Sequence, residues 1–240
     1  MKKYLPLILL ILGILVLILV YFFVIRKPAD KGTTEEDQGL IEVSLKDRPI
    51  TSLTPSADGH WLKLKIEKIK VSAKTLDYEL LYQLPDGRTQ GVPGTVKLTG
   101  ENSFIRDLLL GSESSGKFRY DEGVEEGTLT LRFRDDKGKL LAKFSAKFHL
   151  QSNTKEITSV DGKLKATLNK LPSKAFFVTM ETFGVPGSVE SVNGGPYGIF
   201  TSTVEKLTGE VKLSGASPKT WNGSAWVEDS SIIPGIYILQ

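Results

Sequence analysis

The chain contains 240 residues, with 31 Lys and Arg against 28 Asp and Glu, two His and no Cys. Charged residues (25%) and apolar residues (40%) have the proportions of a globular protein, which excludes a wholly disordered or collagen-like chain. The absence of Cys excludes disulfide bonds, thiol nucleophiles and Cys-ligated zinc or iron–sulfur clusters. We therefore expect a folded protein without a cofactor or a metal ion.

The first apolar segment predicts a membrane anchor. The run from Leu5 to Ile25 contains no charged residue and follows a short basic start. As a helix it would span roughly 30 Å, the thickness of the hydrocarbon core of a bilayer. A cleaved signal peptide, the alternative, has a shorter apolar centre and a small-residue cleavage site, and residues 22–27 offer no such site. We therefore expect an uncleaved, single-pass signal-anchor that makes the membrane a partner of the chain.

The orientation of this anchor depends on its flanks. Basic residues lie on both sides of it, so the positive-inside rule is nearly balanced. The short N-terminal tail is the easier end to leave inside, and we expect a cytoplasmic N-terminus with the later domains extracytoplasmic, at the cell membrane. Residues 1–27 then form the cytoplasmic tip and transmembrane helix, and residues 28–39 form a polar, flexible linker.

Alternation with a period of two dominates the rest of the chain and predicts β-strands. In residues 62–67, Leu and Ile alternate with Lys and Glu. The phase changes before Ile69, which indicates a bulge near residues 67–68. A second stripe covers residues 78–84, whereas residues 104–110 fit either a short helix or a strand.

The clearest hairpin covers residues 128–150, with a turn at residues 135–138 whose sequence is Asp-Asp-Lys-Gly. Its apolar phase predicts that Phe133, Phe144 and Phe148 are buried. The opposite phase carries basic side chains, which we expect on the outer face.

A second block of short strands begins near Ser152. Its candidate strands are residues 163–169, 175–183, 197–201, 209–214, 224–228 and 235–239. Turn signals at such short intervals are typical of β-sandwiches. Both blocks contain Ile-Thr-Ser, then Asp-Gly, a basic–apolar strand and Gly-Val-Pro-Gly in the same order, which indicates either a duplication or a chance likeness between two β domains. We expect one sandwich at residues 40–151 and another at residues 152–240.

This arrangement resembles the immunoglobulin-like and fibronectin-type-III-like sandwiches that many bacterial envelope proteins carry behind one anchor. The resemblance covers the chain after the linker and rests on strand pattern, since the Cys–Trp–Cys signature of antibody domains is absent. It implies an all-β protein with two tandem immunoglobulin-like domains behind one transmembrane helix. It also implies binding or spacing rather than catalysis.

Two short motifs suggest catalysis but lack parts that the chemistry needs. Residues 111–117 have the spacing of a phosphate-binding loop, but Phe118 stands where magnesium requires Ser or Thr. Ser114 and Lys117 match the S-x-x-K of serine acyl-enzymes that act on cell walls, although that pair must share a helical turn and Gly116 lies between them. We expect a Ser/Gly turn between strands, and a cell-wall acyl hydrolase is the alternative function.

His60 and His149 are the only histidines, and we expect both to be exposed strand residues rather than ligands or catalytic bases. Carboxylates in residues 121–126 could gather calcium. Their spacing matches no established ligand pattern, so a solvated acidic loop is the expected structure. The four acids are Asp121, Glu122, Glu125 and Glu126.

Two surface features are candidates for binding. Basic side chains alternate with apolar ones on neighbouring strands and could meet an anionic glycan, whereas a solubilising face is the simpler explanation given the net charge of +3. Aromatic residues concentrate in the second block, where they form either an exposed contact patch or part of the core. The candidate binding residues are Arg119, Arg132, Arg134, Lys143, Lys147, Tyr197, Trp221 and Trp226.

These observations predict a membrane-anchored, extracytoplasmic binding or scaffold protein of the cell envelope, without enzymatic activity. Its expected partners are another envelope protein or an anionic glycan. We expect no nucleic-acid partner.

Overall fold

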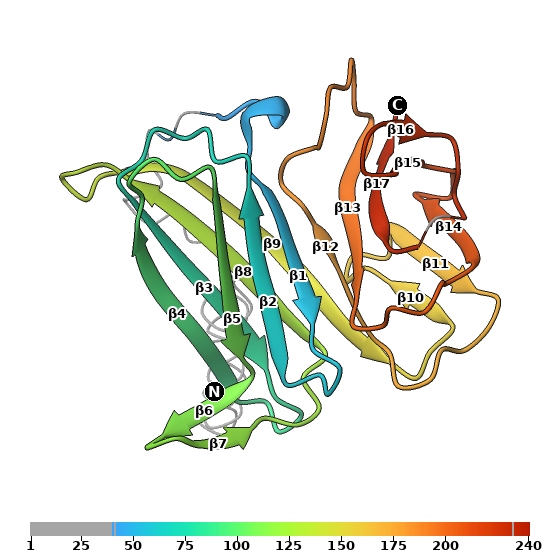
Figure 1. Ribbon diagram of the computed structural model, residues 1–240, viewed down its shortest axis with the longest axis horizontal. Helices are drawn as coiled ribbons and strands as arrows, with labels where there is room; N and C mark the ends of the chain where they lie inside the picture. Colours follow the sequence, from blue (N-terminus) through green and yellow to red (C-terminus); the bar gives the residue numbers. More distant parts are fainter. Residues whose placement is uncertain (1–39, 41, 232) are drawn as a thin grey trace, which may run out of the picture. The chain divides into compact units, whose positions relative to one another are not determined.

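β-Strands form almost all of the regular structure in the computed structural model, which describes residues 40, 42–231 and 233–240 (Figure 1). Leu40–Gln240 forms a compact unit of its own. The predicted anchor, from Leu5 to Ile25, and the predicted linker at residues 28–39 lie outside the described residues. Within the described part, no helix is long and apolar enough to cross a membrane.

The elements follow one another in chain order after a short 3-10 turn, η3 (Leu45–Asp47). The strands are β1 (Ile50–Pro55), β2 (Trp61–Glu67), β3 (Thr75–Gln83), β4 (Thr89–Lys97), β5 (Ser103–Leu109), β6 (Gly111–Ser114), β7 (Lys117–Tyr120), β8 (Glu126–Arg134), β9 (Leu140–Ser152), β10 (Glu156–Thr158), β11 (Leu164–Leu168), β12 (Phe176–Glu181), β13 (Gly194–Thr201), β14 (Gly209–Leu213), β15 (Lys219–Trp221), β16 (Trp226–Val227) and β17 (Gly235–Leu239). Residues 104–110, which fit either structure in the sequence, therefore fall mainly in a strand, β5.

The largest sheet runs through both halves of the chain. Its nine strands have the order β16-β15-β17-β13-β12-β9-β8-β3-β4, and two separate three-stranded sheets have the orders β1-β2-β5 and β10-β11-β14. A two-stranded sheet, β6-β7, completes the set. The predicted boundary between residues 151 and 152 falls at the end of β9, which pairs antiparallel with β12 from the second block. The two blocks are thus joined by continuous hydrogen bonding.

The first hydrophobic core lies between the β1-β2-β5 sheet and one face of the large sheet. Leucine and isoleucine side chains of β2 belong to the same buried cluster as alternate residues of β3, β8 and β9. Alternation puts successive side chains on opposite faces of a strand, so each strand gives half of its residues to this core. Phe133, Phe144 and Phe148 have 0%, 9% and 0% exposure, which confirms the predicted burial of all three.

The second core lies on the opposite face of the large sheet. In β12, Val178 and Met180 belong to the first core, whereas Phe177 belongs to a cluster with the β10-β11-β14 sheet. Because neighbouring residues of a strand point to opposite faces, the two three-stranded sheets cover opposite faces of the large sheet. Strand β12 is therefore buried on both sides, which explains why its sequence, Phe-Phe-Val-Thr-Met, does not alternate.

The repeated sequence forms the same turn twice. Ser56 Oγ donates a hydrogen bond to Asp58 Oδ1 (2.5 Å), and Ser159 Oγ donates to Asp161 Oδ1 (2.6 Å). In each turn the serine oxygen also accepts a backbone N–H at 3.0 Å, five residues further along the chain. The two blocks therefore share the structure of this turn as well as its sequence. Their later strands pair differently, since β3 lies between β4 and β8 whereas β12 lies between β9 and β13.

The irregularity predicted near residues 67–68 lies at the end of β2. Strand β2 ends at Glu67, and Lys68 adopts a left-handed conformation with φ of 58°. The phase change before Ile69 thus falls at the end of the strand, where Lys68 is one extra residue and the Ile69 N–H donates to the carbonyl oxygen of Asn102 at 3.0 Å. Lys68 Nζ donates to the carbonyl oxygen of Val185 (3.1 Å), which ties this corner to the second block.

Candidate functional site

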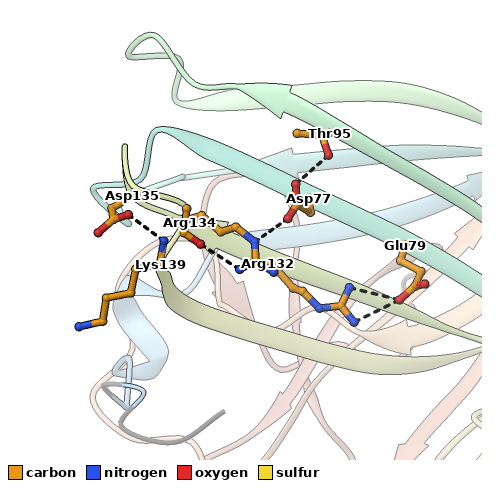
Figure 2. A network of polar contacts seen from close by, with 8 residues as sticks. Asp77, Glu79, Thr95, Arg132, Arg134, Asp135 and Lys139 are labelled. Atoms are coloured by element: carbon orange, nitrogen blue, oxygen red, sulfur yellow. Dashed lines mark hydrogen bonds and ion pairs between the residues drawn. The ribbon is translucent and has the colours of Figure 1, made fainter. Parts of the chain in front are cut away.

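The predicted basic residues of β8 face outward, but acidic neighbours compensate their charge. Arg132 contacts Glu79 Oε2 at 3.2 Å, and Arg134 Nε donates to Asp77 Oδ2 at 2.7 Å (Figure 2). Asp77 also accepts a hydrogen bond from Thr95 Oγ1 at 2.7 Å. The arginine side chains keep only 27% and 19% of their exposure. This part of the outer face is a network of charge pairs between strands rather than an open cationic surface.

The other basic candidates are distributed over different parts of the chain. Lys143 lies opposite Arg132 in β9, where it is half-buried and has interaction partners of its own. Lys147 lies on the same strand and is exposed. Arg119 belongs to β7, in the separate two-stranded sheet. The five candidates therefore do not share one sheet.

The aromatic candidates of the second block are held by internal contacts. Tyr197 is buried, and its hydroxyl donates a hydrogen bond to Asp161 Oδ2. Burial and this bond raise the pKa of Tyr197. Partial burial opposes ionisation of Asp161, but hydrogen bonds from Ser159 and Tyr197 outweigh it and lower the pKa of that carboxyl. This pair fixes the β10–β11 turn to β13.

The two tryptophans form a half-buried pair. The rings of Trp221 and Trp226 lie 5.5 Å apart between centroids. Trp226 Nε1 donates to the carbonyl oxygen of Pro186 at 3.1 Å, and Gly187 lies so near the Trp221 ring that an added Cβ would be 2.7 Å from it. The pair thus holds the loop between β12 and β13.

A different group of aromatic side chains, two of them exposed and two half-buried, lies on the first block. His60 and Tyr120 stack with centroids 4.3 Å apart, Tyr120 and Phe118 lie parallel at 6.2 Å, and Phe118 meets Trp61 edge-on at 5.6 Å. We call these four residues the aromatic row. Phe118 retains 46% exposure and Tyr120 retains 39%. Rings of this size are usually covered in a folded protein, so the exposed part of the row is a candidate contact surface.

The hairpin β6–β7 explains how the row forms. Ser114 pairs with Lys117, and the two residues between them, Ser115 and Gly116, both have positive φ. That geometry suits a tight two-residue hairpin. In β7, Lys-Phe-Arg-Tyr alternates, so its two aromatic rings share one face and its two basic residues share the other.

A cavity of about 490 Å³ adjoins the row. His60 belongs to both features, and the residues that follow Tyr120 continue directly into the cavity wall. The lining side chains include five carboxylates and both histidines but no Lys or Arg. The ionisable lining residues are Asp58, His60, Asp121, Glu122, Glu125, His149 and Glu156. We call this feature the acidic cavity.

Hydrogen bonds hold several of the lining groups in place. Tyr82 Oη donates to Asp121 Oδ2 at 2.8 Å, and partial burial together with this bond raises the pKa of Tyr82. Hydrogen bonds from the Ser56 hydroxyl and the His60 backbone N–H lower the pKa of Asp58. Glu156 pairs with Lys165 at 3.0 Å. These contacts hold Asp121, Asp58 and Glu156 in place, and the cavity lining contains no Lys or Arg.

The histidines are half-buried, not exposed as the sequence predicted. His149 Nδ1 lies 2.8 Å from the carbonyl oxygen of Thr158. That oxygen can only accept, so Nδ1 carries the proton. Gln151 and Thr179 donate to the same carbonyl oxygen at 3.0 and 2.8 Å. His60 Nε2 lies 3.9 Å from Glu122. Within the part of the chain that the structure describes, no three His, Asp or Glu side chains are arranged to hold a metal ion.

The two catalytic-looking motifs fall in the β6–β7 hairpin. Ser114 and Lys117 are cross-strand partners at its turn, and both are exposed. The acyl-enzyme chemistry requires these residues on one helical turn, and the phosphate-loop chemistry requires a helix that begins after the glycines. Residues 117–120 form strand β7 instead.

Sequence reasoning missed the aromatic row because its members come from strands far apart in the chain. The available signal for the row was the alternation of basic and aromatic residues in 117–120. This alternation puts two aromatic rings on one face of a strand, where exposed rings need a partner. His60 and Trp61 could be added only once β2 and β7 were placed together.

Comparison of the chain with protein-family models, with curated proteins and with solved structures finds no match in any of the three. The aromatic row and the acidic cavity are therefore the features of the molecule that bear on its function.

Proposed function

We propose that this protein is a non-catalytic, single-pass membrane protein of the cell envelope that holds a binding surface outside the membrane. In this proposal the apolar run from Leu5 to Ile25 is the anchor, and the all-β unit beyond the linker carries the recognition surface. The aromatic row and the acidic cavity together form that surface.

The strand arrangement supports a binding or scaffold role. The three-stranded sheet β1-β2-β5 packs on β4-β3-β8-β9, and β10-β11-β14 packs on the other end and other face of the same sheet. Two antiparallel layers around each core are the arrangement of immunoglobulin-like and fibronectin-type-III-like sandwiches. We propose two such domains in tandem, fused through β9 and β12. Domains of this kind present loops and hairpins at their ends for contact with partners.

The exposed aromatic row is the observation that carries the proposal. Phe118 and Tyr120 are both exposed, and Trp61 and His60 contact them from β2 and from the turn before it. Exposed rings next to a cavity are typical of a surface that contacts another molecule. The acidic lining of the cavity favours an envelope protein over an anionic glycan among the two partners expected from the sequence.

Binding to isolated cell envelopes tests the recognition surface. The soluble fragment 40–240, which contains both hydrophobic cores, should sediment with envelopes of the source cells. The double variant Phe118→Ala/Tyr120→Ala should lose that binding, whereas Leu171→Ala, which removes an exposed apolar side chain elsewhere, should not. Equal binding of all three proteins would refute a role for the aromatic row.

The absence of cysteine makes the membrane topology easy to test. A single cysteine introduced at Lys137, in the exposed turn between β8 and β9, should react with a membrane-impermeant maleimide on intact, wall-stripped cells. Labelling only after permeabilisation would show that the orientation is reversed.

A further inference from the structure

We propose that the aromatic row and the acidic cavity recognise a positively charged peptide segment of a partner protein, rich in Lys or Arg. This inference rests on the proposed function, since it names the class of partner for the same surface. The rings, the neighbouring charges and the shape of the cavity each support this partner.

The rings provide a surface that attracts cations as well as apolar groups. Lys and Arg carry aliphatic stems that pack on aromatic faces and a charged end that is attracted by the ring quadrupole. Phe118 and Tyr120 lie parallel at 6.2 Å and remain exposed. His60 stacks on Tyr120 and so covers one face of that ring, and a basic side chain would lay its stem along the parts of Phe118 and Tyr120 that remain exposed.

The charge next to the row has the complementary sign. Asp121 and Glu122 directly follow Tyr120, and Asp58 precedes His60 by two residues. All of them line the acidic cavity, which contains no Lys or Arg. The basic residues of the hairpin, Lys117 and Arg119, alternate with the rings and so point to its other face. A cation that lies on the rings thus meets carboxylates and no nearby cation of the hairpin.

The shape of the acidic cavity and the arrangement of its lining carboxylates favour a peptide over a metal ion or a glycan. The carboxylates of the described residues do not converge on one point as metal ligands do, and the cavity of about 490 Å³ can accept a side chain. A neutral sugar would stack on the rings but would not require so many carboxylates beside them. An anionic glycan would be repelled by the carboxylates.

Fluorescence anisotropy with three labelled octapeptides tests the inference directly. The peptides have one glycine-spaced design and carry Lys/Arg, Ser or Glu at the variable positions. The fragment 40–240 should bind the basic peptide about tenfold or more tightly than the Ser peptide, with no binding of the Glu peptide. Rising salt should weaken the interaction because part of it is between exposed charges.

Variants of the fragment separate the two contributions. Phe118→Ala/Tyr120→Ala and Glu122→Gln/Glu125→Gln should each weaken binding of the basic peptide by about fivefold or more, since a few contacts of this kind together amount to that factor. Leu171→Ala and Glu228→Gln, which change exposed residues elsewhere, should bind as the wild type. Far-ultraviolet circular dichroism of each variant establishes that the fold is kept.

Four results would overturn the inference. If Phe118→Ala/Tyr120→Ala binds the basic peptide normally, the attraction is diffuse charge and the row is not the site. If a neutral oligosaccharide binds to the row and the basic peptide does not, the ligand class is wrong although the proposed binding surface stands. If no peptide binds while envelope sedimentation still depends on the row, the inference fails and the proposed function survives. If envelope sedimentation is also independent of the row, both fail.

Discussion

Replacing Phe148 by alanine should remove a large part of the stability of the protein. Phe148 is fully buried in β9, with its ring directly over Gly127 of β8, where an added Cβ would lie 2.4 Å from the ring. On the other side of β9, its cross-strand partner in β12 is Met180. The ring therefore fills the space at which the two blocks of the large sheet meet. Glycine offers no side chain that could move into the vacated space.

The expected magnitude follows from the lost burial and the cavity left behind. Truncation of a buried Phe to Ala costs about 3–5 kcal/mol, against a total stability of about 5–15 kcal/mol for a typical domain. In a unit of this size each kcal/mol corresponds to a shift of about 2–4 °C in the melting temperature. We therefore expect the melting temperature to fall by about 6–20 °C.

Denaturant and thermal melts of the fragment 40–240 measure this effect against a neighbouring control. Lys147 precedes Phe148 in β9 but is exposed, so Lys147→Ala should change the free energy of unfolding by no more than about 0.5 kcal/mol. A harmless Phe148→Ala together with a strongly destabilising Lys147→Ala would mean that the strand register is shifted by one residue. In that case the faces assigned to every side chain of β8 and β9 would be inverted.

Three further predictions concern polar groups. Thr51 Oγ1 is buried and lacks a hydrogen-bond partner within the described residues, whereas Thr179 Oγ1 donates to a carbonyl oxygen at 2.8 Å. Thr51→Val should therefore stabilise the protein and Thr179→Val should destabilise it. Denaturant melts should show a change of about 1 kcal/mol in the free energy of unfolding for each variant. A double-mutant cycle on Arg132 and Glu79 should give a coupling energy below about 1 kcal/mol that declines with salt, because the pair remains partly exposed. Asp161→Asn should be less stable than the wild type at neutral pH, because hydrogen bonds lower the pKa of Asp161 in the folded protein from its ordinary value of 3.8. Urea melts at several pH values should show this difference in the free energy of unfolding disappearing as the pH falls from 3.8 through the lower folded pKa.

The sequence predicts β2, β3 and β9 well because each of these strands alternates and has a single buried face. The 128–150 hairpin, its turn and its three buried phenylalanines follow directly from alternation. Strand β12 is different, since it is covered on both faces and therefore loses the alternating pattern. The pairing of β9 with β12 joins the two blocks in one sheet, and no local pattern indicates which strand edges will meet.

The candidate site was harder to predict than the fold, for a physical reason. Arg132 and Arg134 have the spacing of a basic outer face, but the acidic residues that neutralise them lie in β3, more than fifty residues earlier. Whether a charged side chain on the outer face of a strand is free or paired depends on the residues of the neighbouring strand. The same dependence explains why Tyr197 and the tryptophan pair have internal partners although their sequence alone fits a contact patch.

The environment of the aromatic row also depends on strands that are distant in the sequence. Phe118 and Tyr120 belong to a hairpin that the sequence marks only as a Ser/Gly turn, and their neighbours His60 and Trp61 lie more than fifty residues earlier in the chain. A short hairpin with every residue of one strand exposed has little core to hold it, so the stacking of Tyr120 on His60 and the edge-on contact of Phe118 with Trp61 help to hold it. Those contacts cover part of each ring and leave Phe118 and Tyr120 open to solvent, where a partner can add the burial that the fold does not supply.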